Sequence, residues 1–446
     1  SPGTRWKFGS IHLLFAQMRS RLCAQIHHAW NRCLGRGRWC HWSRRCNGCL
    51  LDLAGLVAVA LDVILAADSL QRPLTGIGRY TYELAKRLAA HKDIARLRYF
   101  SMGSWVANPL ADLDERQPGS TRHSPDRPSL RTILATNRAA VRVYQALTPT
   151  LYGWRLRGNN RAIYHSPNFI VPPFNGAVVS TVHDLSHILH PKFHPQARVD
   201  FMNLAFDVSM KRTDHVITDS ETVRTEFLNR FNWAPERVTA IALGVDPEYH
   251  PRSADELHAV LAQWGLRFQG YVLYVGSIEP RKNLERLLKA YSTLPLAMRR
   301  EHPLVMAGSR GWHSDQIHKQ MEIGRAEGWV HYLSFVSQAH LPLLYAGAAL
   351  FAYPSLYEGF GLPIAEAMAS GVPVITSGVS CMPEVAGGAA KLINPLDLED
   401  ISSALRECLD SGSWRNQARE RGIERAADFS WDQCARQTVD VYASIR

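Results

Sequence analysis

Residues 357–366 read Tyr-Glu-Gly-Phe-Gly-Leu-Pro-Ile-Ala-Glu, and residues 367–375 continue as Ala-Met-Ala-Ser-Gly-Val-Pro-Val-Ile. This pattern predicts a glycine loop, a short helix and a buried strand. Pro363 suits the first helical position because it lacks an N–H group, and Gly371 suits a left-handed residue after the helix. Glycines let a ligand approach the free amides at the start of such a helix, which favours an anion and most naturally a phosphate.

Two glutamates, Glu358 and Glu366, bracket the glycine loop. One interpretation is structural: Glu366 stabilises its own helix and Glu358 is solvated. The spacing favours function, because two glutamates separated by seven residues, with Gly-Phe-Gly-Leu-Pro between them, resemble the nucleotide-sugar motif of family 4 glycosyltransferases, retaining enzymes of GT-B fold. The resemblance implies that Glu366 binds the donor ribose and Glu358 the transferred sugar. It also implies that loop amides approach the sugar and diphosphate, at Gly359, Phe360, Gly361 and Leu362.

Length and charge limit the remaining possibilities. With 446 residues and 46% apolar content, the chain can bury two cores of ordinary size. The net charge of +11 is concentrated in residues 1–50, which hold nine of the 51 Lys and Arg residues and no Asp or Glu. The rest of the chain is nearly neutral, which argues against a nucleic-acid-binding surface over the whole protein.

Residues 1–50 also hold five of the eight cysteines and four of the twelve tryptophans. The five cysteines and His41 invite a zinc interpretation, but their spacing matches no standard zinc finger or knuckle. Residues 1–56 are therefore predicted to be a poorly ordered extension, or residues upstream of the natural start. Its apolar run is too short for a secretory signal core or a spanning helix. The remaining cysteines are scattered, which favours a reducing compartment.

A buried strand is predicted at residues 56–63, followed by Thr-Gly-Ile-Gly-Arg-Tyr at 75–80 and a helical pattern. A Gly-x-Gly sequence alone is usually an ordinary turn. Its place after the first strand matches a family loop that approaches the donor phosphates, so the resemblance implies that Gly76 and Gly78 bind the donor.

Two further strands, predicted at 177–182 and 215–218, end at His183-Asp184 and at Asp219-Ser220. Ligands of doubly wound α/β domains bind beyond the carboxyl ends of the strands. A histidine there is often structural, but His183-Asp184-Leu185 resembles the family segment whose histidine reaches the donor sugar. His183 is accordingly a candidate catalytic residue beside Glu358.

The strand predicted at 271–276 leads into Glu-Pro-Arg-Lys-Asn at 279–283. An exposed basic pair on such a loop is usually only solvated. Arg281 and Lys282 stand where the family places its diphosphate-binding Arg and Lys, and the two side-chain types suit forked and compact phosphate contacts. The resemblance also suggests that the loop after Val336 approaches the nucleobase.

Strands alternate with helices, which predicts the α/β class. The resemblance implies a GT-B fold with two Rossmann-like doubly wound domains facing across a cleft. The predicted divisions are a basic Cys/Trp-rich extension, an acceptor domain, a donor domain and a C-terminal helix that crosses back to the first domain, at 1–56, 57–245, 246–428 and 429–446.

The resemblance implies transfer of a sugar from a nucleoside diphosphate sugar to a glycan or lipid-linked acceptor, with retention at the anomeric carbon. Arg281, Lys282 and the loop amides would offset charge on the departing diphosphate. On this scheme no metal or other cofactor is expected. The motifs look most like bacterial mannosyl- or rhamnosyltransferases of surface polysaccharide synthesis, which points to a GDP-linked donor and a cytoplasmic enzyme.

Residues 131–182 contain no Asp or Glu. Their arginines are interleaved with Tyr144, Tyr152 and Trp154. Such a surface can lie against anionic lipid; the alternative is a solvated basic face. We expect peripheral contact with the inner face of the cytoplasmic membrane through residues 131–161. The arginines concerned are Arg131, Arg138, Arg142, Arg155, Arg157 and Arg161.

Two alternative functions remain open from the sequence. One is another GT-B activity, such as a nucleotide-sugar epimerase or a sugar phosphate synthase. The other is a catalytically silent GT-B subunit that binds a partner enzyme, and the presence of Glu358, Glu366, Arg281 and Lys282 argues against it.

Overall fold

The computed structural model describes residues 60–71, 74, 76–111 and 151–446. The described residues form one compact unit that contains two sheets. Each sheet is built from short buried strands alternating with helices, so the α/β class and the two Rossmann-like halves predicted from the sequence are confirmed.

The first sheet has seven strands in the order β3-β2-β1-β4-β5-β6-β7. All of its neighbouring strands are parallel except β2 and β3. Every residue of β4, β5 and β6 is buried, as expected for parallel strands covered on both faces. The strands are β1 (Leu61–Ala66), β2 (Ile94–Ser101), β3 (Ser104–Val106), β4 (Ile163–Ser166), β5 (Val178–Val182), β6 (His215–Thr218) and β7 (Val238–Ala240).

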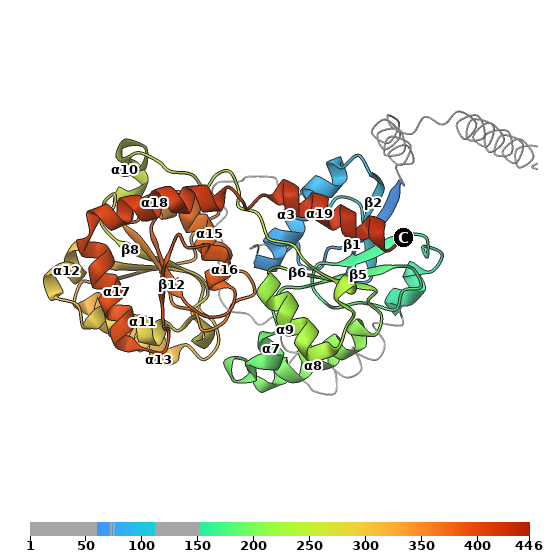
Figure 1. Cartoon of the computed structure of the whole chain (residues 1–446), viewed down its shortest axis with the longest axis horizontal. Helices are drawn as coiled ribbons and strands as arrows, with labels where there is room; N and C mark the ends of the chain where they lie inside the picture. Colours follow the sequence, from blue (N-terminus) through green and yellow to red (C-terminus); the bar gives the residue numbers. More distant parts are fainter. Residues whose placement is uncertain (1–59, 72–73, 75, 112–150) are drawn as a thin grey trace, which may run out of the picture. The chain divides into compact units, whose positions relative to one another are not determined.

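Helices cover both faces of this sheet, with α3 and α19 on one side and α8 and α9 on the other (Figure 1). The core follows the same division: Ile217 of β6 belongs to the cluster that includes Leu84 of α3, whereas Val216 packs with Phe206 of α8 and Phe227 of α9. The helices of this half are α3 (Gly76–Ala90), α7 (Ser186–Leu189), α8 (Gln196–Met210) and α9 (Glu221–Phe231), with 3₁₀ turns η1 (Pro191–Phe193) and η2 (Pro235–Arg237).

The second sheet has six parallel strands in the order β10-β9-β8-β11-β12-β13. The chain order reverses between β8 and β11, and ligands of such sheets bind at this switch point. The strands are β8 (Val272–Val275), β9 (Leu304–Ala307), β10 (Val330–Ser334), β11 (Leu350–Tyr353), β12 (Val374–Ser377) and β13 (Lys391–Ile393).

Helices of the second half precede, connect and follow these strands. They are α10 (Ala254–Ala262), α11 (Leu284–Ser292), α12 (Leu296–Glu301), α13 (Asp315–Ala326), α14 (Leu341–Ala346), α15 (Leu362–Ala369), α16 (Met382–Ala386), α17 (Leu398–Asp410) and α18 (Gly412–Ala426), with the 3₁₀ turn η3 (Pro280–Lys282).

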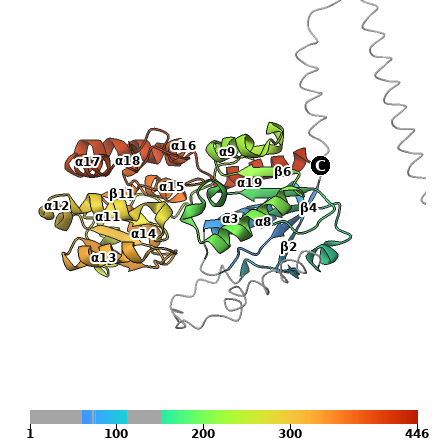
Figure 2. The ribbon, with the colours of Figure 1, turned by 90° about the horizontal axis from the view of Figure 1, so that it is seen from below.

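The last helix, α19 (Trp431–Ser444), lies against the first half. It packs on α3, whereas α18 packs on α15 of the second half (Figures 1 and 2). The segment that follows β7 contacts the segment that precedes α19. The amide of Val245 donates to the carbonyl of Phe429 at 3.1 Å, and a Cβ on Gly244 would lie 2.1 Å from the backbone nitrogen of Trp431. Glycine at position 244 therefore allows the connecting segments to pack closely.

Three sequence expectations on element bounds need correction. The first strand runs to Ala66, three residues past the predicted end at Val63, and positions 56–59 of the prediction lie outside the described residues. The charge of Asp62 on this strand is compensated by Arg98 on β2 at 3.0 Å. Gly76 and Gly78 lie in the first turn of α3 and not in a loop before it. Strand β10 ends at Ser334 and not at Val336, because the left-handed φ of 52° at Ser334, its last residue, turns the chain out of the extended conformation.

Several expectations concern residues outside the described ranges: the N-terminal extension with its cysteines and His41, Thr75, and the basic positions between 131 and 150. Among the described cysteines, Cys381, Cys408 and Cys434 are buried and unpaired. Within the described ranges, no helix combines the length and apolar character needed to cross a membrane.

Candidate active site

The glycine loop lies between β11 and α15, against the end of β5. A Cβ on Gly359 would lie 1.8 Å from the carbonyl oxygen of His183, so the two backbones touch and only glycine fits. The hydroxyl of Ser220 donates to the carbonyl of Gly359 at 2.7 Å. Gly361 has a φ of 91° before the start of α15, and Pro363 is the second helical residue, one position later than predicted. The loop and the ends of β5 and β6 therefore meet at one place.

Glu358 lies between the two basic side chains. Its carboxylate accepts hydrogen bonds from the Arg281 guanidinium at 2.7 Å and from the Lys282 ammonium at 2.6 Å. Glu358 is only 6% exposed. Burial alone would raise its pKa, but the charges of Arg281 and Lys282 outweigh burial and hold the pKa at about 2. Glu358 is therefore a carboxylate at every physiological pH.

The basic pair has further partners. Arg281 donates to Glu279 at 3.1 Å and to the carbonyl of Tyr357 at 2.7 Å, and Lys282 donates to the Tyr353 hydroxyl at 2.6 Å. Burial and the adjacent guanidinium lower the pKa of Lys282. Two cations and two carboxylates thus balance in this cluster. The structure brings Arg281 and Lys282 to the start of the glycine loop, and their binding of a diphosphate stays a prediction.

Glu366 lies within α15, eight residues after Glu358, and its pKa is shifted in the opposite direction. It is 7% exposed, and burial raises its pKa to about 7, although the charge of Arg79 and the hydroxyls of Tyr345 and Tyr249 lower it. Neither hydroxyl completes a hydrogen bond of ordinary length and angle. Near neutral pH, Glu366 is therefore divided between its charged and neutral forms.

His183 is held by hydrogen bonds at both ring nitrogens. Nδ1 lies 2.7 Å from a carboxylate oxygen of Asp219, and Nε2 lies 2.8 Å from the carbonyl oxygen of Pro167. Burial lowers its pKa, but the charge of Asp219 outweighs burial and raises the pKa above its ordinary value. Both partners are acceptors, so the arrangement favours a doubly protonated ring.

The remaining sequence candidates do not share one environment. Phe360 is buried, and its ring packs edge-on against Phe429 at 5.3 Å, so its side chain is part of the core. Leu362 is half-buried against the core at the start of α15. Gly78 is buried, whereas an added Cβ on Gly76 would meet no atom within 4 Å. For these residues, only backbone contacts with a ligand remain open as a role.

Sequence reasoning missed four residues of this region. Asp219 was noted as a strand end but not as the partner of His183. Asp184, whose carboxylate accepts from the Ser186 amide at 2.8 Å, has a pKa lowered by nearby Arg281 although burial raises it. Arg79 and Tyr249, which lie near Glu366, come from segments far apart in the chain. Strand-end position is the one sequence signal that could have found Asp219.

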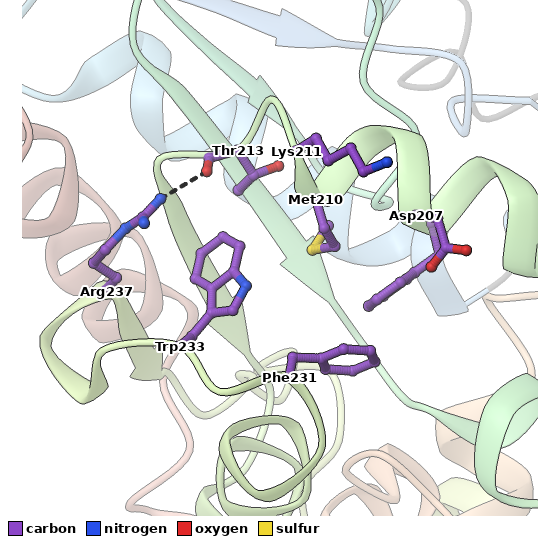
Figure 3. Close-up of a pocket in the computed structure, with 8 residues that line it drawn as sticks. Asp207, Met210, Lys211, Thr213, Phe231, Trp233 and Arg237 are labelled. Carbon is purple, nitrogen blue, oxygen red and sulfur yellow. Dashed lines mark hydrogen bonds between the residues drawn. The ribbon is translucent and has the colours of Figure 1, made fainter.

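A separate pocket of about 610 Å³ lies at the amino ends of β6 and β7 (Figure 3). Phe231 and Trp233 line it, and Arg237 packs over the Trp233 ring at 4.4 Å while donating to the carbonyl of Thr213 at 2.9 Å. His183 follows the carboxyl end of β5, so this pocket is at the opposite edge of the sheet. No site residue predicted from the sequence lines it.

Among the residues that the structure describes, no group of three or more His, Cys, Asp or Glu side chains is arranged to hold a metal ion. The basic pair binds the carboxylate of Glu358, which lies at the start of the loop that leads into α15.

Comparison with known proteins places this geometry in a family. Residues 74–249 match the model of "Glycosyltransferase Family 4", and residues 267–425 match that of "Glycosyl transferases group 1". The chain is 39% identical over 382 residues to the O-antigen chain mannosyltransferase B of Escherichia coli, covering 86% of this chain and 99% of the relative. The chain belongs to the family 4 glycosyltransferases. It is therefore an enzyme that transfers hexose units, and it is similar to enzymes of polysaccharide synthesis.

Solved structures confirm the GT-B fold expected for this family. The sucrose-phosphate synthase of Thermosynechococcus elongatus is 21% identical with a TM-score of 0.62, covering 86% of this chain and 98% of that one. The Anabaena protein HepE, solved in complex with UDP and glucose, is 17% identical with a TM-score of 0.61, covering 86% of this chain and all of the other. At these identities the similarity shows the fold alone.

Proposed function

We propose that this glycosyltransferase moves mannose from GDP-mannose to a hydroxyl of a lipid-linked glycan in polysaccharide synthesis, with retention at the anomeric carbon. The observation that carries the proposal is the placement of Arg281 and Lys282 on Glu358 at the glycine loop. The sugar is taken from the Escherichia coli relative, which is named a mannosyltransferase.

The basic pair would receive the donor diphosphate. In the structure both cations are neutralised by Glu358 and Glu279, so a diphosphate entering the loop would share them with these carboxylates. Negative charge grows on the departing phosphate oxygen, and preorganised cations and amides stabilise that charge without reorganisation. This scheme supplies the leaving-group stabilisation from Arg281, Lys282 and the loop amides, with no metal ion assigned a role.

Glu358 would orient the transferred sugar. Its carboxylate is ionised, buried and held from two sides, so it can accept hydrogen bonds from sugar hydroxyls at a defined position. Glu366 would accept from the donor ribose. His183 would act as a fixed cationic side of the same site, with its charge held by Asp219.

The test is a transfer assay with the purified chain. It would be supplied with GDP-mannose, GDP-rhamnose, UDP-glucose or ADP-glucose and a synthetic lipid-linked mannoside, without added metal. We expect transfer from GDP-mannose and an α-linked product in the proton–carbon coupling of the new anomeric centre. A β-linked product would contradict retention, and transfer from another donor would replace the donor assignment.

A catalytically silent subunit is the alternative from a different class. Glu358→Gln and the matched control Glu407→Gln separate the two. Glu407 forms an exposed ion pair with Lys391 at 2.9 Å, away from the glycine loop. Transfer that is lost in the first variant and kept in the second supports the enzyme, and absence of transfer in the unaltered chain with every donor favours the silent subunit. An added phosphate on the product would identify a sugar phosphate synthase.

Peripheral membrane contact through residues 131–161 stays part of the proposal. Within the described part of this segment, Trp154 is 61% exposed and Arg157 and Arg161 are exposed, while Arg155 donates to the carbonyl of Gly103 at 2.8 Å. Replacing Arg157 and Arg161 by glutamine should reduce co-sedimentation with anionic liposomes at low salt, since each cation contributes roughly 1 kcal/mol near the surface. Unchanged sedimentation would remove this contact from the account.

A further inference from the structure

Arg79 belongs to the first half of the protein but contacts Asp246 in the connection between the halves and Gln338 in the second half. It lies in the first turn of α3, directly after the Gly-Ile-Gly sequence, and its side chain is 15% exposed. Its guanidinium forms an ion pair with Asp246 at 3.0 Å and donates a hydrogen bond to the side-chain carbonyl of Gln338. Asp246 lies in the connection between the two sheets, and Gln338 lies between β10 and α14.

The same guanidinium acts on Glu366 through its charge, which lowers the pKa of that carboxyl group. Its central carbon is 5.9 Å from the ring centroid of Tyr249, and Tyr249 and Glu366 face each other. The groups that face Glu366 are Arg79 from α3, Tyr249 and Asp246 from the connection, and Tyr345 from α14. Arg79 is the cation among these groups. It opposes both the burial of Glu366 and the repulsion from Asp246.

We propose that Arg79 is a positioning residue of the donor site, which holds Asp246, Tyr249 and the Gln338 segment in place around Glu366 so that a nucleoside diphosphate finds its ribose acceptor already formed. This inference rests on the proposed function, because it assigns the nucleoside end of the same donor.

Two consequences distinguish this role from a structural one. Without Arg79, burial and Asp246 are opposed only by the hydroxyls of Tyr345 and Tyr249, so the pKa of Glu366 rises. A neutral carboxyl group accepts ribose hydroxyls less well, since hydrogen bonds to a charged acceptor are roughly twice as strong as neutral ones. As pH is lowered, nucleotide affinity should therefore begin to fall at a higher pH in the variant than in the unaltered protein.

The experiment is calorimetric titration of the full chain with GDP, UDP or ADP, without metal, from pH 6 to pH 9. The variants are Arg79→Ala, Arg79→Lys and Glu366→Gln. The matched control is Arg98→Ala, because Arg98 also bridges two elements through a carboxylate at 3.0 Å with similar exposure, on the outer side of β1 and β2.

At pH 7 we expect Arg79→Ala to bind the preferred nucleotide about tenfold more weakly or worse, which corresponds to loss of one hydrogen bond to a charged group. As pH is lowered from 9 to 6, its affinity should begin to fall at a higher pH than the affinity of the unaltered protein. Arg79→Lys should lie between the two, and Glu366→Gln should show no such step. These variants also keep the test valid if Arg79→Ala folds poorly.

The inference is overturned if Arg79→Ala binds with the same affinity and pH profile as Arg98→Ala. It is also overturned if Glu366→Gln, folded by circular dichroism, keeps the pH profile of the unaltered protein. The proposed function fails by a different result, in which the unaltered protein itself binds none of the nucleotides.

Discussion

Glu358 and Glu366 are nearly equally buried, yet their surroundings drive their pKa values in opposite directions. Glu358 lies against two cations that come from η3, whereas Glu366 faces two tyrosine hydroxyls and one arginine that comes from α3. The comparison teaches that the number of cations within reach, rather than burial, decides the charge of a carboxylate here. We expect the two sites to respond oppositely to the same substitution.

The largest effect is expected for Glu358→Gln. Removing this carboxylate leaves Arg281 and Lys282 close together and partly uncompensated, and breaking a buried pair destabilises a protein by about 3–5 kcal/mol. Denaturant unfolding would measure the loss, and transfer activity should disappear with it. The control is Glu407→Gln, whose exposed pair should contribute less than about 1 kcal/mol. Equal stability of the two variants would contradict the described cluster.

The second effect concerns the backbone contact that places Glu358. Gly359→Ala should destabilise the protein by about 1–3 kcal/mol, because the added methyl group overlaps the carbonyl oxygen of His183 and the backbones must separate. Gly76→Ala is the paired comparison, since its Cβ meets no atom within 4 Å.

Thermal unfolding of both variants, with nucleotide titration of each, tests this difference. A folded Gly359→Ala protein with unchanged stability would mean that the loop and the end of β5 are not in contact.

The third effect is a change of sign at Glu366. Its folded pKa of about 7 lies above the ordinary value of 4.5, so the folded state binds more protons, and the stability contributed by this group is lost as pH rises from about 4.5 to about 7. Glu366→Gln removes this cost. We expect the variant to be more stable than the unaltered protein by about 1–3 kcal/mol at pH 8 and similar to it at pH 5.

Unfolding at both pH values, on the unaltered protein and the variant, measures this dependence. The opposite sign applies to Glu358, whose lowered pKa makes its contribution present above about 4.5 and lost as pH falls towards 2. A Glu366→Gln protein that is less stable at pH 8 than at pH 5, relative to the unaltered chain, would contradict the assignment.

A smaller effect is expected for Asp219→Asn. The substitution removes the charge that raises the pKa of His183, so that pKa should fall below its present value. With its raised folded pKa, His183 contributes stability that is present below its ordinary pKa of 6.5 and lost as pH rises through the folded pKa. We expect a loss of about 1–2 kcal/mol at pH 6 that shrinks at pH 9. NMR titration of the imidazole measures the pKa directly, and an unchanged value would refute the pairing.

Much of the fold followed from local patterns. Strand β6 has the bounds that the sequence predicted, α15 begins next to Pro363, and Gly371 has the expected left-handed φ of 71°. Local patterns failed at the bounds of some elements. Strand β1 runs three residues past its predicted end, to Ala66, and α3 begins at Gly76, inside the predicted loop.

The site followed in part from the resemblance to the family, which brought Glu358, Arg281 and Lys282 together. The sequence could not supply the partners, since Asp219 meets His183 only through the pairing of β5 with β6. Arg79 meets Glu366 only through the packing of the two halves. Such contacts depend on the tertiary structure, and no local period or spacing encodes them.

The central claim is that Arg281 and Lys282 receive the donor diphosphate beside Glu358. The most direct measurement is calorimetric titration of GDP and GDP-mannose into the unaltered protein, the Arg281→Ala, Lys282→Ala double variant, and Lys289→Ala, whose exposed ion pair with Glu285 lies on the next helix. The account predicts that the double variant loses binding while Lys289→Ala keeps the affinity of the unaltered protein. Equal affinity in all three proteins would contradict it.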